Sequence, residues 1–250
     1  MLAGKHVMIS GGGSGVGAEL ARQFIAAKAR VTILGRREAP LQAVADSLGC
    51  LALRCDVTDA AALGDAMTMA IEEQGPVQVA VANAGAAASK PFAQMQAADL
   101  TAMLDVNLTG VFNLWHAALP GMKAAKWGRM IAVASTAGLK GYPYVSGYVA
   151  AKHGVVGLTR ALAMELGQSG ITVNAICPGF IDTPLLDRSI DMITAKTGKT
   201  REGATKSLIA GNPQGRLIEV DEVAATAVWL CSDAARSVNG HALAISGGEI

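Results

Sequence analysis

The chain has 250 residues, of which 51% are hydrophobic and 16% are charged, so it can build the core of one large α/β domain or two small ones. A formal net charge of +1 gives no argument for a nucleic-acid-binding protein. The N-terminus lacks the apolar core of a signal peptide, and no apolar run reaches the roughly 18 residues of a membrane span. The four cysteines show no C-x-x-C spacing and predict reduced thiols, so we expect a cytoplasmic protein.

The first predicted strand, residues 6–10, leads through a glycine-rich turn into a helix that begins near residue 18. The turn reads Gly11-Gly-Gly-Ser-Gly15-Val-Gly17. Such a turn lets the backbone approach a phosphate, and the following helix offers N–H groups and the positive end of its dipole. Because the turn lies between a strand and a helix, it predicts a nucleotide site.

The second predicted strand, residues 30–34, is followed by Gly35, Arg36 and Arg37. In an NAD site, an acidic residue at this strand end binds the adenosine ribose hydroxyls. Here that carboxylate is missing, and a guanidinium can bind a 2′-phosphate through two hydrogen bonds. The pattern favours NADP, with NAD as the alternative if the arginines are solvated or if Arg36 stacks on the adenine.

A helix at 39–48 and a third strand at 50–54 lead to an acidic loop. Asp56 either accepts a hydrogen bond from the adenine amino group or is an ordinary loop acid. Thr58 or Asp59 is the expected N-cap of the next helix, which runs to about residue 74.

The fourth predicted strand, 78–82, ends in Asn83-Ala84-Gly85, whose small residues allow close approach of a ligand or a neighbouring strand. A long helix is predicted at about 97–119, where Pro120 and Gly121 would end it. Asn107 lies among its apolar residues. Because a buried amide needs hydrogen-bond partners, Asn107 either bonds to backbone or belongs to a polar relay.

The fifth predicted strand ends at Ser135, and a helix from Tyr148 to about residue 166 follows a loop. Tyr148 and Lys152 are four residues apart and therefore share one helix face. The lysine cation would lower the phenol pKa from about 10, so that Tyr148 can exchange a proton with an alcohol or carbonyl oxygen. The Ser135 hydroxyl can stabilise charge on the same oxygen.

The helices at 97–119 and 148–166 are apolar nearly all round. A helix without a polar face is buried on both sides. The two helices therefore predict burial against a second subunit.

The sixth predicted strand, 171–176, precedes the run Cys177-Pro-Gly-Phe-Ile-Asp-Thr183-Pro. The segment at about 184–215 is longer and more polar, so we expect it to be a substrate lid. Its cations could meet an acidic group such as a CoA phosphate, or could cover a solvated surface. They are Arg188, Lys196, Lys199, Arg201 and Lys206.

A last helix at 221–231, with Asp221 as its expected N-cap, and a strand at 241–245 complete the pattern. Strands and helices thus alternate about seven times. This predicts the α/β class: a single domain over 1–250 of the doubly wound Rossmann type, with a seven-stranded parallel sheet and helices on both faces. The candidate residues after each strand therefore converge on the carboxyl edge of one sheet.

In these features the chain resembles the short-chain dehydrogenase/reductase family over nearly its whole length. The family motifs are present as Ser10-Gly11-x-x-x-Gly15-x-Gly17, Ala82-Asn83-Ala84-Gly85, Ser135 thirteen residues before Tyr148-x-x-x-Lys152, and Pro178-Gly179 with Thr183. Ser10 and Ala82 replace the family's threonine and first asparagine. Neither change removes a catalytic group.

The resemblance implies that Tyr148 is the acid/base, that Ser135 orients the substrate oxygen, and that Lys152 tunes the phenol and holds the nicotinamide ribose. It also implies that Asn107 anchors a water in a proton relay, and that family members are commonly homotetramers. The expected cofactor-binding residues are Ser10, Gly11, Gly13, Ser14, Gly15, Val16, Gly17, Gly35, Arg36, Arg37, Asp56, Val57, Asn83, Ala84, Gly85, Tyr148, Lys152, Pro178, Gly179, Ile181 and Thr183.

We therefore expect an NAD(P)-dependent oxidoreductase that acts on a small molecule, a 3-oxoacyl thioester or a similar ketone. An alternative is a cyclic-alcohol or steroid-type dehydrogenase whose pocket is lined by Ser135, Tyr142, Tyr144 and Phe180. A cofactor-binding regulator without turnover is a further alternative, although Ser135, Tyr148 and Lys152 are all present. The four histidines show no metal-ligand spacing, so no metal is expected.

Overall fold

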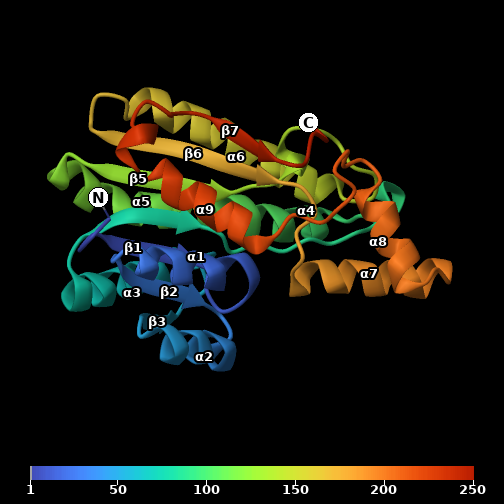
Figure 1. Ribbon diagram of the computed structural model, residues 1–250, viewed down its shortest axis with the longest axis horizontal. Coiled ribbons are helices and arrows are strands. Elements are labelled where there is room, and N and C mark those ends of the chain that lie inside the picture. Colours follow the sequence, from blue (N-terminus) through green and yellow to red (C-terminus); the bar gives the residue numbers. More distant parts are fainter. Residues whose placement is uncertain (1) are drawn as a thin grey trace.

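A computed structural model of the protein, which describes residues 2–250 except the side chains of Leu185, Arg188 and Lys196, contains one seven-stranded parallel sheet (Figure 1). The strands are β1 (His6–Ser10), β2 (Arg30–Gly35), β3 (Leu51–Arg54), β4 (Val77–Ala82), β5 (Gly128–Val133), β6 (Ile171–Pro178) and β7 (Ala242–Ile245). Their order, β3-β2-β1-β4-β5-β6-β7, reverses direction between β1 and β4. This doubly wound order confirms the predicted fold class.

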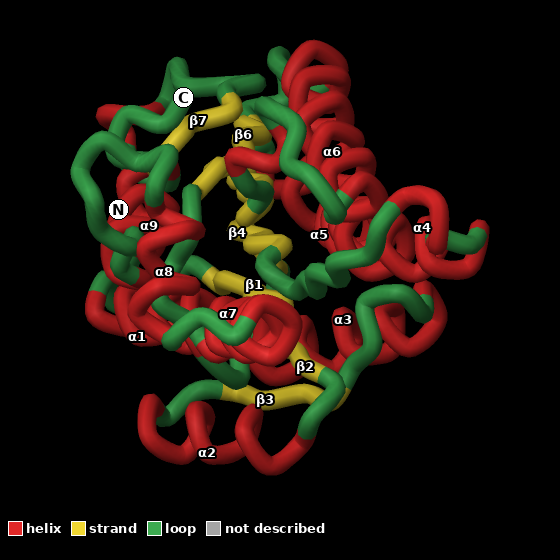
Figure 2. Tube along the Cα trace, turned by 90° about the vertical axis from the view of Figure 1, so that its right-hand side faces the viewer, coloured by secondary structure: helices red, strands yellow, loops and turns green. Residues whose placement is uncertain are grey.

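Helices cover both faces of the sheet, as Figure 2 shows in a view turned by 90° from that of Figure 1. The helices are α1 (Gly15–Ala26), α2 (Glu38–Leu48), α3 (Ala60–Gln74), α4 (Ala97–Leu104), α5 (Gly110–Ala125), α6 (Ser146–Glu165), α7 (Pro184–Thr197), α8 (Arg201–Ile209) and α9 (Val220–Leu230). The helices α1, α2 and α9 pack against one face, and α3, α5 and α6 pack against the other. Helices α7 and α8 project beyond the sheet (Figure 1).

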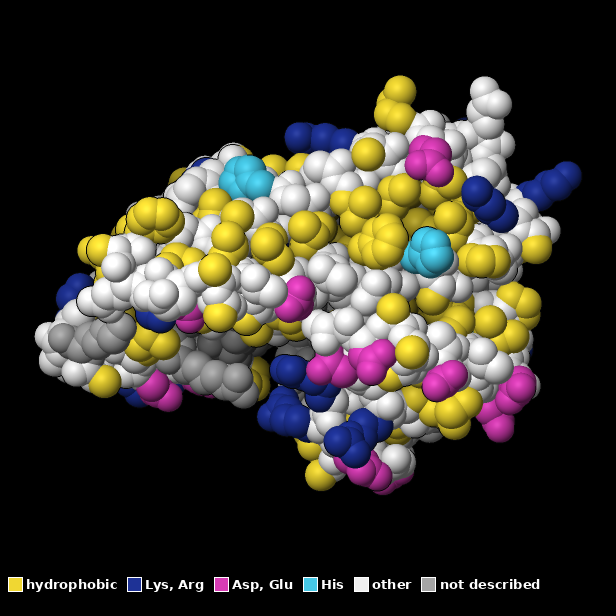
Figure 3. Space-filling view, turned by 180° about the vertical axis from the view of Figure 1, so that it is seen from behind, with side chains coloured by type: hydrophobic (Ala, Val, Ile, Leu, Met, Phe, Trp, Pro, Cys, Tyr) yellow, Lys and Arg dark blue, Asp and Glu magenta, His cyan; other side chains and the backbone are white. Residues whose placement is uncertain are grey.

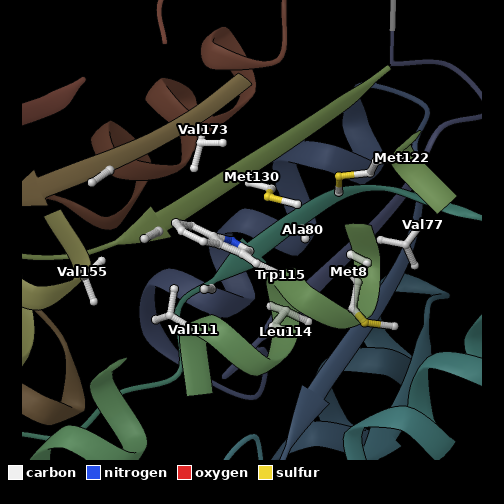
Figure 4. Close-up of a cluster of buried hydrophobic side chains, with 14 of the residues drawn as sticks. Met8, Val77, Ala80, Val111, Leu114, Trp115, Met122, Met130, Val155 and Val173 are labelled. Atoms are coloured by element: carbon white, nitrogen blue, oxygen red, sulfur yellow. The ribbon is translucent and has the colours of Figure 1, made fainter. Parts of the chain in front are cut away.

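Each face of the sheet carries its own hydrophobic core. On the α5 side, the fully buried Trp115 lies among side chains of strands and of α6, including Met130, Val155 and Val173 (Figure 4). Strands buried on both faces are nearly continuous runs of apolar residues, which is why β1, β4, β5 and β6 were recognisable in the sequence. The two cores hold the strand ends at fixed positions along one edge.

The predicted helix at 97–119 is wrong in both its continuity and its end. A π-helical turn, Asp105–Thr109, separates α4 from α5, and α5 continues through Pro120 to Ala125. Proline normally breaks a helix interior, but the buried Met122 anchors the last turn in the core. Gly128 leaves space for the Met122 side chain, because a Cβ at position 128 would lie 2.6 Å from the Met122 sulfur.

Two helix starts were predicted from capping residues. Asp59 does cap α3, since its carboxylate accepts hydrogen bonds from the N–H groups of Ala61 and Ala62. Asp221 does not cap α9, because Glu219 forms a reciprocal capping box with Glu222 two residues earlier than expected. A reciprocal pair satisfies two backbone N–H groups at the helix start, so the pair sets where α9 begins.

The loop after β3 is fixed against the start of α5. The buried Val57 accepts a hydrogen bond from Asn113 Nδ2 at 2.8 Å through its carbonyl oxygen. Gly110 makes this approach possible, since a Cβ there would lie 2.6 Å from Val57 Cγ2. The loop that carries Asp56 is therefore held near the carboxyl edge of the sheet.

Candidate active site

The glycine-rich turn at residues 11–17 has the shape of a phosphate cradle. Gly11 and Gly15 have φ values of 70° and 52°, in the left-handed region that favours glycine. A Cβ on Gly17 would lie 2.1 Å from Gly11 O, so no other residue fits there. Ser14 makes no side-chain cap at the start of α1. Backbone N–H groups at a helix start of this kind can bind a phosphate.

Ser10 and Asn83 tie the ends of β1 and β4 together beneath this turn. Ser10 Oγ accepts hydrogen bonds from the backbone N–H groups of Asn83 and Ala84, both at 3.0 Å. Asn83 Nδ2 in turn donates to Ser10 O at 3.0 Å and to Gly11 O at 3.2 Å. Both side chains are thus engaged in holding the turn in place.

The segment after β6 returns to the glycine-rich turn. The Thr183 methyl carbon lies 3.2 Å from where a Cβ on Gly15 would stand. Ile181 pairs with Ile218 in an isolated parallel bridge, which fixes the course of the segment. The predicted residues from Pro178 to Thr183 therefore border the same edge as the turn.

The end of the edge that follows β2 and β3, where the adenosine is expected, is exposed and carries opposite charges. Arg36 Nη1 lies 3.7 Å from Asp56 Oδ2, and their side chains are 66% and 40% exposed. Asp56 also accepts hydrogen bonds from the Thr58 N–H at 3.0 Å and hydroxyl at 2.9 Å. Burial tends to raise the Asp56 pKa, but the bonds from Thr58 and the Arg36 charge outweigh it and lower the pKa. Arg37 is the exposed N-cap residue of α2.

The structure brings Ser135, Tyr148 and Lys152 together. Ser135 Oγ accepts a hydrogen bond from the Ala137 N–H at 3.1 Å, which leaves its own proton for another acceptor. Lys152 is 3% exposed; its Nζ donates to Val133 O at 2.9 Å and lies 5.6 Å from the centroid of the Tyr148 ring. The strand end and the helix start thus form one buried polar cluster.

Burial dominates the acid–base properties of this cluster. It raises the pKa of Tyr148, against the opposing effect of the hydrogen bond with Ser135. It also lowers the pKa of Lys152 to about 8. The expected lowering of the phenol pKa by the lysine is therefore not seen, because removing both groups from water favours their neutral forms.

Asn107 lies in the π-helical turn with its side chain fully engaged. Its Oδ1 accepts from the Ala86 N–H at 3.2 Å, and its Nδ2 donates to Ala86 O at 2.9 Å and to Met103 O at 3.0 Å. A Cβ on Gly85 would lie 2.8 Å from Asn107 Oδ1 and 3.8 Å from Lys152 Nζ. The side chain therefore makes the backbone hydrogen bonds considered for it, and it does so beside Lys152; the proton relay stays a prediction.

The residues expected to line the substrate pocket are in different environments. The rings of Tyr142 and Phe180 meet edge to face with centroids 6.1 Å apart. Tyr144 is 62% exposed and has a φ of 68°. Tyr142 also contacts Glu249, which was not predicted. The two are 107 residues apart, and no motif or spacing links such a pair.

The described cations of the segment at 184–215 are paired with partners in the same segment. Arg201 forms ion pairs with Asp187, at 2.6 Å, and with Asp191. Lys206 pairs with Glu202 at 2.8 Å, and Lys199 donates to the Ser207 hydroxyl at 2.8 Å. The other two predicted cations, Arg188 and Lys196, have side chains outside the described part.

Neither a metal site nor a membrane span is found among the described residues. No group of three or more His, Cys, Asp or Glu side chains there could hold a metal ion. No helix over residues 2–250 has both the length and the apolar character needed to cross a membrane.

Comparison with known proteins finds close similarity along the chain. The short chain dehydrogenase family matches residues 5–193. A D-beta-hydroxybutyrate dehydrogenase of Cupriavidus necator is 36% identical, with 100% of this chain and 99% of that protein covered. A putative ketoacyl reductase of the granaticin polyketide synthase of Streptomyces violaceoruber is also 36% identical, with 96% and 91% covered.

Two solved structures have nearly the same backbone. An actinorhodin polyketide ketoreductase with NADPH has a TM-score of 0.95 at 32% identity, with 100% of this chain and 99% of that chain covered. A levodione reductase has a TM-score of 0.94 at 33% identity, with 100% and 98% covered.

Proposed function

Since this chain belongs to the short-chain dehydrogenase/reductase family and is an NAD(P)-dependent oxidoreductase of ketones and alcohols, we propose that it reduces a 3-oxoacyl thioester or a similar ketone. The observation that carries the proposal is the cluster of Ser135, Tyr148 and Lys152 beside the glycine-rich turn. The interpretation as a regulator without turnover is set aside, because the relatives are named dehydrogenases and reductases.

The acid–base roles follow from the direction of the pKa shifts. A bound nicotinamide supplies the hydride. Tyr148, whose pKa burial raises, stays protonated at neutral pH and donates its proton to the carbonyl oxygen as that oxygen gains negative charge. The Ser135 hydroxyl donates a hydrogen bond to the same oxygen and stabilises its developing negative charge. A raised phenol pKa thus suits the reductive direction.

Lys152 and Asn107 support this proton transfer. Lys152 Nζ, anchored on Val133 O, holds the nicotinamide ribose and passes a proton toward Tyr148. Asn107 fixes the Ala86 backbone beside it and keeps the π-helical turn in place. Such turns frequently mark functional sites, and a water held at this break in the helix would complete a relay to Lys152.

NADP is the preferred cofactor in this proposal. The strand end after β2 carries Gly35 and Arg36 with no carboxylate at the ribose position. Arg36 is 66% exposed, so its guanidinium can reorient from Asp56 to a 2′-phosphate. The NADPH named with the related polyketide ketoreductase is consistent with this preference.

A cyclic ketone is the second candidate substrate. The levodione reductase shares the fold at 33% identity, and the aromatic pair Tyr142–Phe180 offers a wall for a ring. The segment at 184–215 is the proposed lid over this pocket. Because Arg201, Lys206 and Lys199 are engaged within the lid, they favour the solvated surface over a CoA-phosphate site.

We further propose a homotetramer assembled through α5 and α6. A shallow groove of about 470 Å³ between them is lined by Leu108, Thr109, Phe112, Gly154, Gly157, Leu158 and Ala161. Figure 3, seen from behind, shows hydrophobic side chains gathered on the face formed by these helices. Phe112 is 49% and Met164 is 86% exposed in the single chain. A second copy of the same helices would cover such a patch.

The assembly can be tested at Gly157. A Cβ there would meet nothing within 4 Å, so Gly157→Glu should leave the subunit folded while it places a charge in the groove. The wild type should scatter light as a tetramer and the variant as a smaller species. A wild-type monomer at micromolar concentration would contradict the proposal.

The four free cysteines suit the reducing cytoplasm, where we place the protein.

The function is tested by cofactor oxidation with a panel of ketones. The panel should contain a 3-oxoacyl thioester, its oxygen ester, a cyclic diketone and a steroid ketone, each with NADPH and NADH. The highest kcat/KM is expected for the thioester or ester with NADPH. A clear preference for the cyclic diketone would select the second candidate, and no turnover with any ketone would overturn the proposal.

A further inference from the structure

A second polar cluster joins the segment after β7 to the loop that carries Ser135. Lys140 Nζ donates to Glu249 Oε1 at 2.8 Å, and the Tyr142 hydroxyl donates to the same oxygen at 2.8 Å. The Tyr142 oxygen also lies 2.7 Å from Thr136 Oγ1. The Glu249 side chain is only 7% exposed. A carboxylate buried to this extent requires a paired charge and hydrogen bonds, and it has both here.

The backbone around Glu249 is shaped for this contact. Gly247 and Gly248 have φ values of 62° and 94°, and this left-handed turn directs Glu249 back into the protein. Two further glycines leave room for the carboxylate. A Cβ on Gly211 would lie 3.0 Å from Glu249 Oε1, and one on Gly179 would lie 3.4 Å from Oε2. The site of the carboxylate is therefore built from three separate segments.

The single proton of the Tyr142 hydroxyl is committed to Glu249. Burial raises the pKa of Tyr142, and the Glu249 carboxylate adds to the rise, so the phenol remains protonated. Since its proton points to Glu249, the Thr136 hydroxyl must donate to Tyr142. The phenol therefore has no proton left for a substrate carbonyl or carboxylate.

This cluster borders the expected substrate pocket. Tyr142 packs edge to face on Phe180, and the nearby Tyr148 phenol contributes to the raised pKa of Tyr142. Lys140 is 37% exposed, and its charge is balanced by Glu249. The cluster thus presents two kinds of surface to a substrate. One is the aromatic pair of Tyr142 and Phe180, and the other is an ion pair without net charge.

We propose that Glu249 sets the substrate class, because by pairing with Lys140 and holding the Tyr142 proton it favours an uncharged 3-oxo ester or thioester over the free 3-oxo acid. The inference rests on the proposed ketone reduction and sharpens it. Without the Glu249 charge, Lys140 would be an unpaired cation able to bind a substrate carboxylate, and the Tyr142 proton would be less firmly held.

The test compares acetoacetate with ethyl acetoacetate, which carry the same ketone and differ in the charge of the acid end. For the wild type, kcat/KM should be higher for the ester. Glu249→Gln keeps the size and an acceptor oxygen but removes the charge. It should raise the acid-to-ester ratio of kcat/KM about tenfold, the usual effect of one hydrogen bond to a charged group, mainly through a lower KM for the acid.

Three further variants separate charge from structure. Lys140→Met combined with Glu249→Gln removes the cation as well, and the ratio should return toward the wild-type value. Lys140→Met alone leaves the Glu249 charge uncompensated and should lower the ratio, which provides a second test if Glu249→Gln folds poorly. Glu222→Gln, in the separate Arg216 ion pair, should leave the ratio unchanged.

The outcomes are distinct. A wild type that prefers the acid, or a ratio that Glu249→Gln does not move, would overturn this inference alone. A wild type that reduces neither compound, nor any other ketone, would instead refute the proposed function. Melting temperatures of all variants show whether each change in ratio comes from a folded protein.

Discussion

Two polar groups at the same edge of the sheet differ in their contact with water. Lys152 is 3% exposed, and burial lowers its pKa to about 8. Arg36, at the other end of the edge, is 66% exposed and 3.7 Å from its partner Asp56. The first region has lost most of its hydration, whereas the second is screened by solvent.

This difference decides how strongly each region acts. In a buried cluster, electrostatic interactions and proton transfers have large effects because water does not compete. At an exposed site, an ion pair contributes little and reorients easily. We therefore expect substitutions in the buried cluster to change chemistry by orders of magnitude, and those at the adenosine end to change only cofactor preference.

The largest effect is expected at Tyr148. Tyr148→Phe keeps the ring but removes the transferable proton, so turnover should fall by about 10²–10⁴-fold, the usual contribution of general acid catalysis. Cofactor affinity, measured by titration of NADPH fluorescence, should stay close to that of the wild type. Near-normal turnover would remove Tyr148 from the mechanism.

Lys152→Met should abolish turnover, weaken cofactor binding and stabilise the fold at neutral pH. Because burial lowers the Lys152 pKa from 10.5 to about 8, the unfolded chain holds one more proton between these values. By linkage, wild-type stability rises with pH across this window, whereas below pH 8 the folded state bears the full desolvation cost.

The expected gain for Lys152→Met at pH 7 is on the order of 2 kcal/mol, after subtracting the lost hydrogen bond to Val133 O. Urea titrations at several pH values measure it. The gain should shrink between pH 8 and 10.5. If the variant were less stable than the wild type at pH 7, the burial of the charged Lys152 side chain would cost little free energy of folding.

The smallest effect is expected at Arg36. Arg36→Ala should lower the preference for NADP over NAD by about ten- to a hundredfold, since the lost contact is a hydrogen-bonded pair of charged groups. Gly35→Asp should reverse the preference by adding an acceptor for the ribose hydroxyls, once the Leu41 side chain, 3.2 Å from the new Cβ, shifts aside.

Steady-state constants with both cofactors provide the test, and Arg22→Ala on the outer surface of α1 is a matched control. Equal or better kcat/KM of the wild type with NAD would reverse the cofactor preference and place Arg36 outside phosphate recognition.

The local sequence pattern alone predicts which residues lie at this edge, because the apolar runs of the strands are followed by glycine, asparagine or serine. Parallel strands must bury both faces, so their sequences are continuous apolar runs, and the residues after them share one edge. That reasoning was sufficient to bring Ser135, Tyr148 and Lys152 together with the glycine-rich turn. It depends only on local pattern and on the geometry of a parallel sheet.

Features that depend on contacts between distant segments follow from the folded structure and not from the sequence pattern. Pro120 is tolerated inside α5 because the buried Met122 fills a space beside Gly128. The phenol of Tyr148 has a raised pKa because burial exceeds any help from its neighbours. The contact of Glu249 with Lys140 and Tyr142 required a glycine turn and the folding of the last strand onto the sheet. The desolvation of a polar group and the contact between distant segments arise only when the chain is packed, so no local pattern in the sequence encodes them.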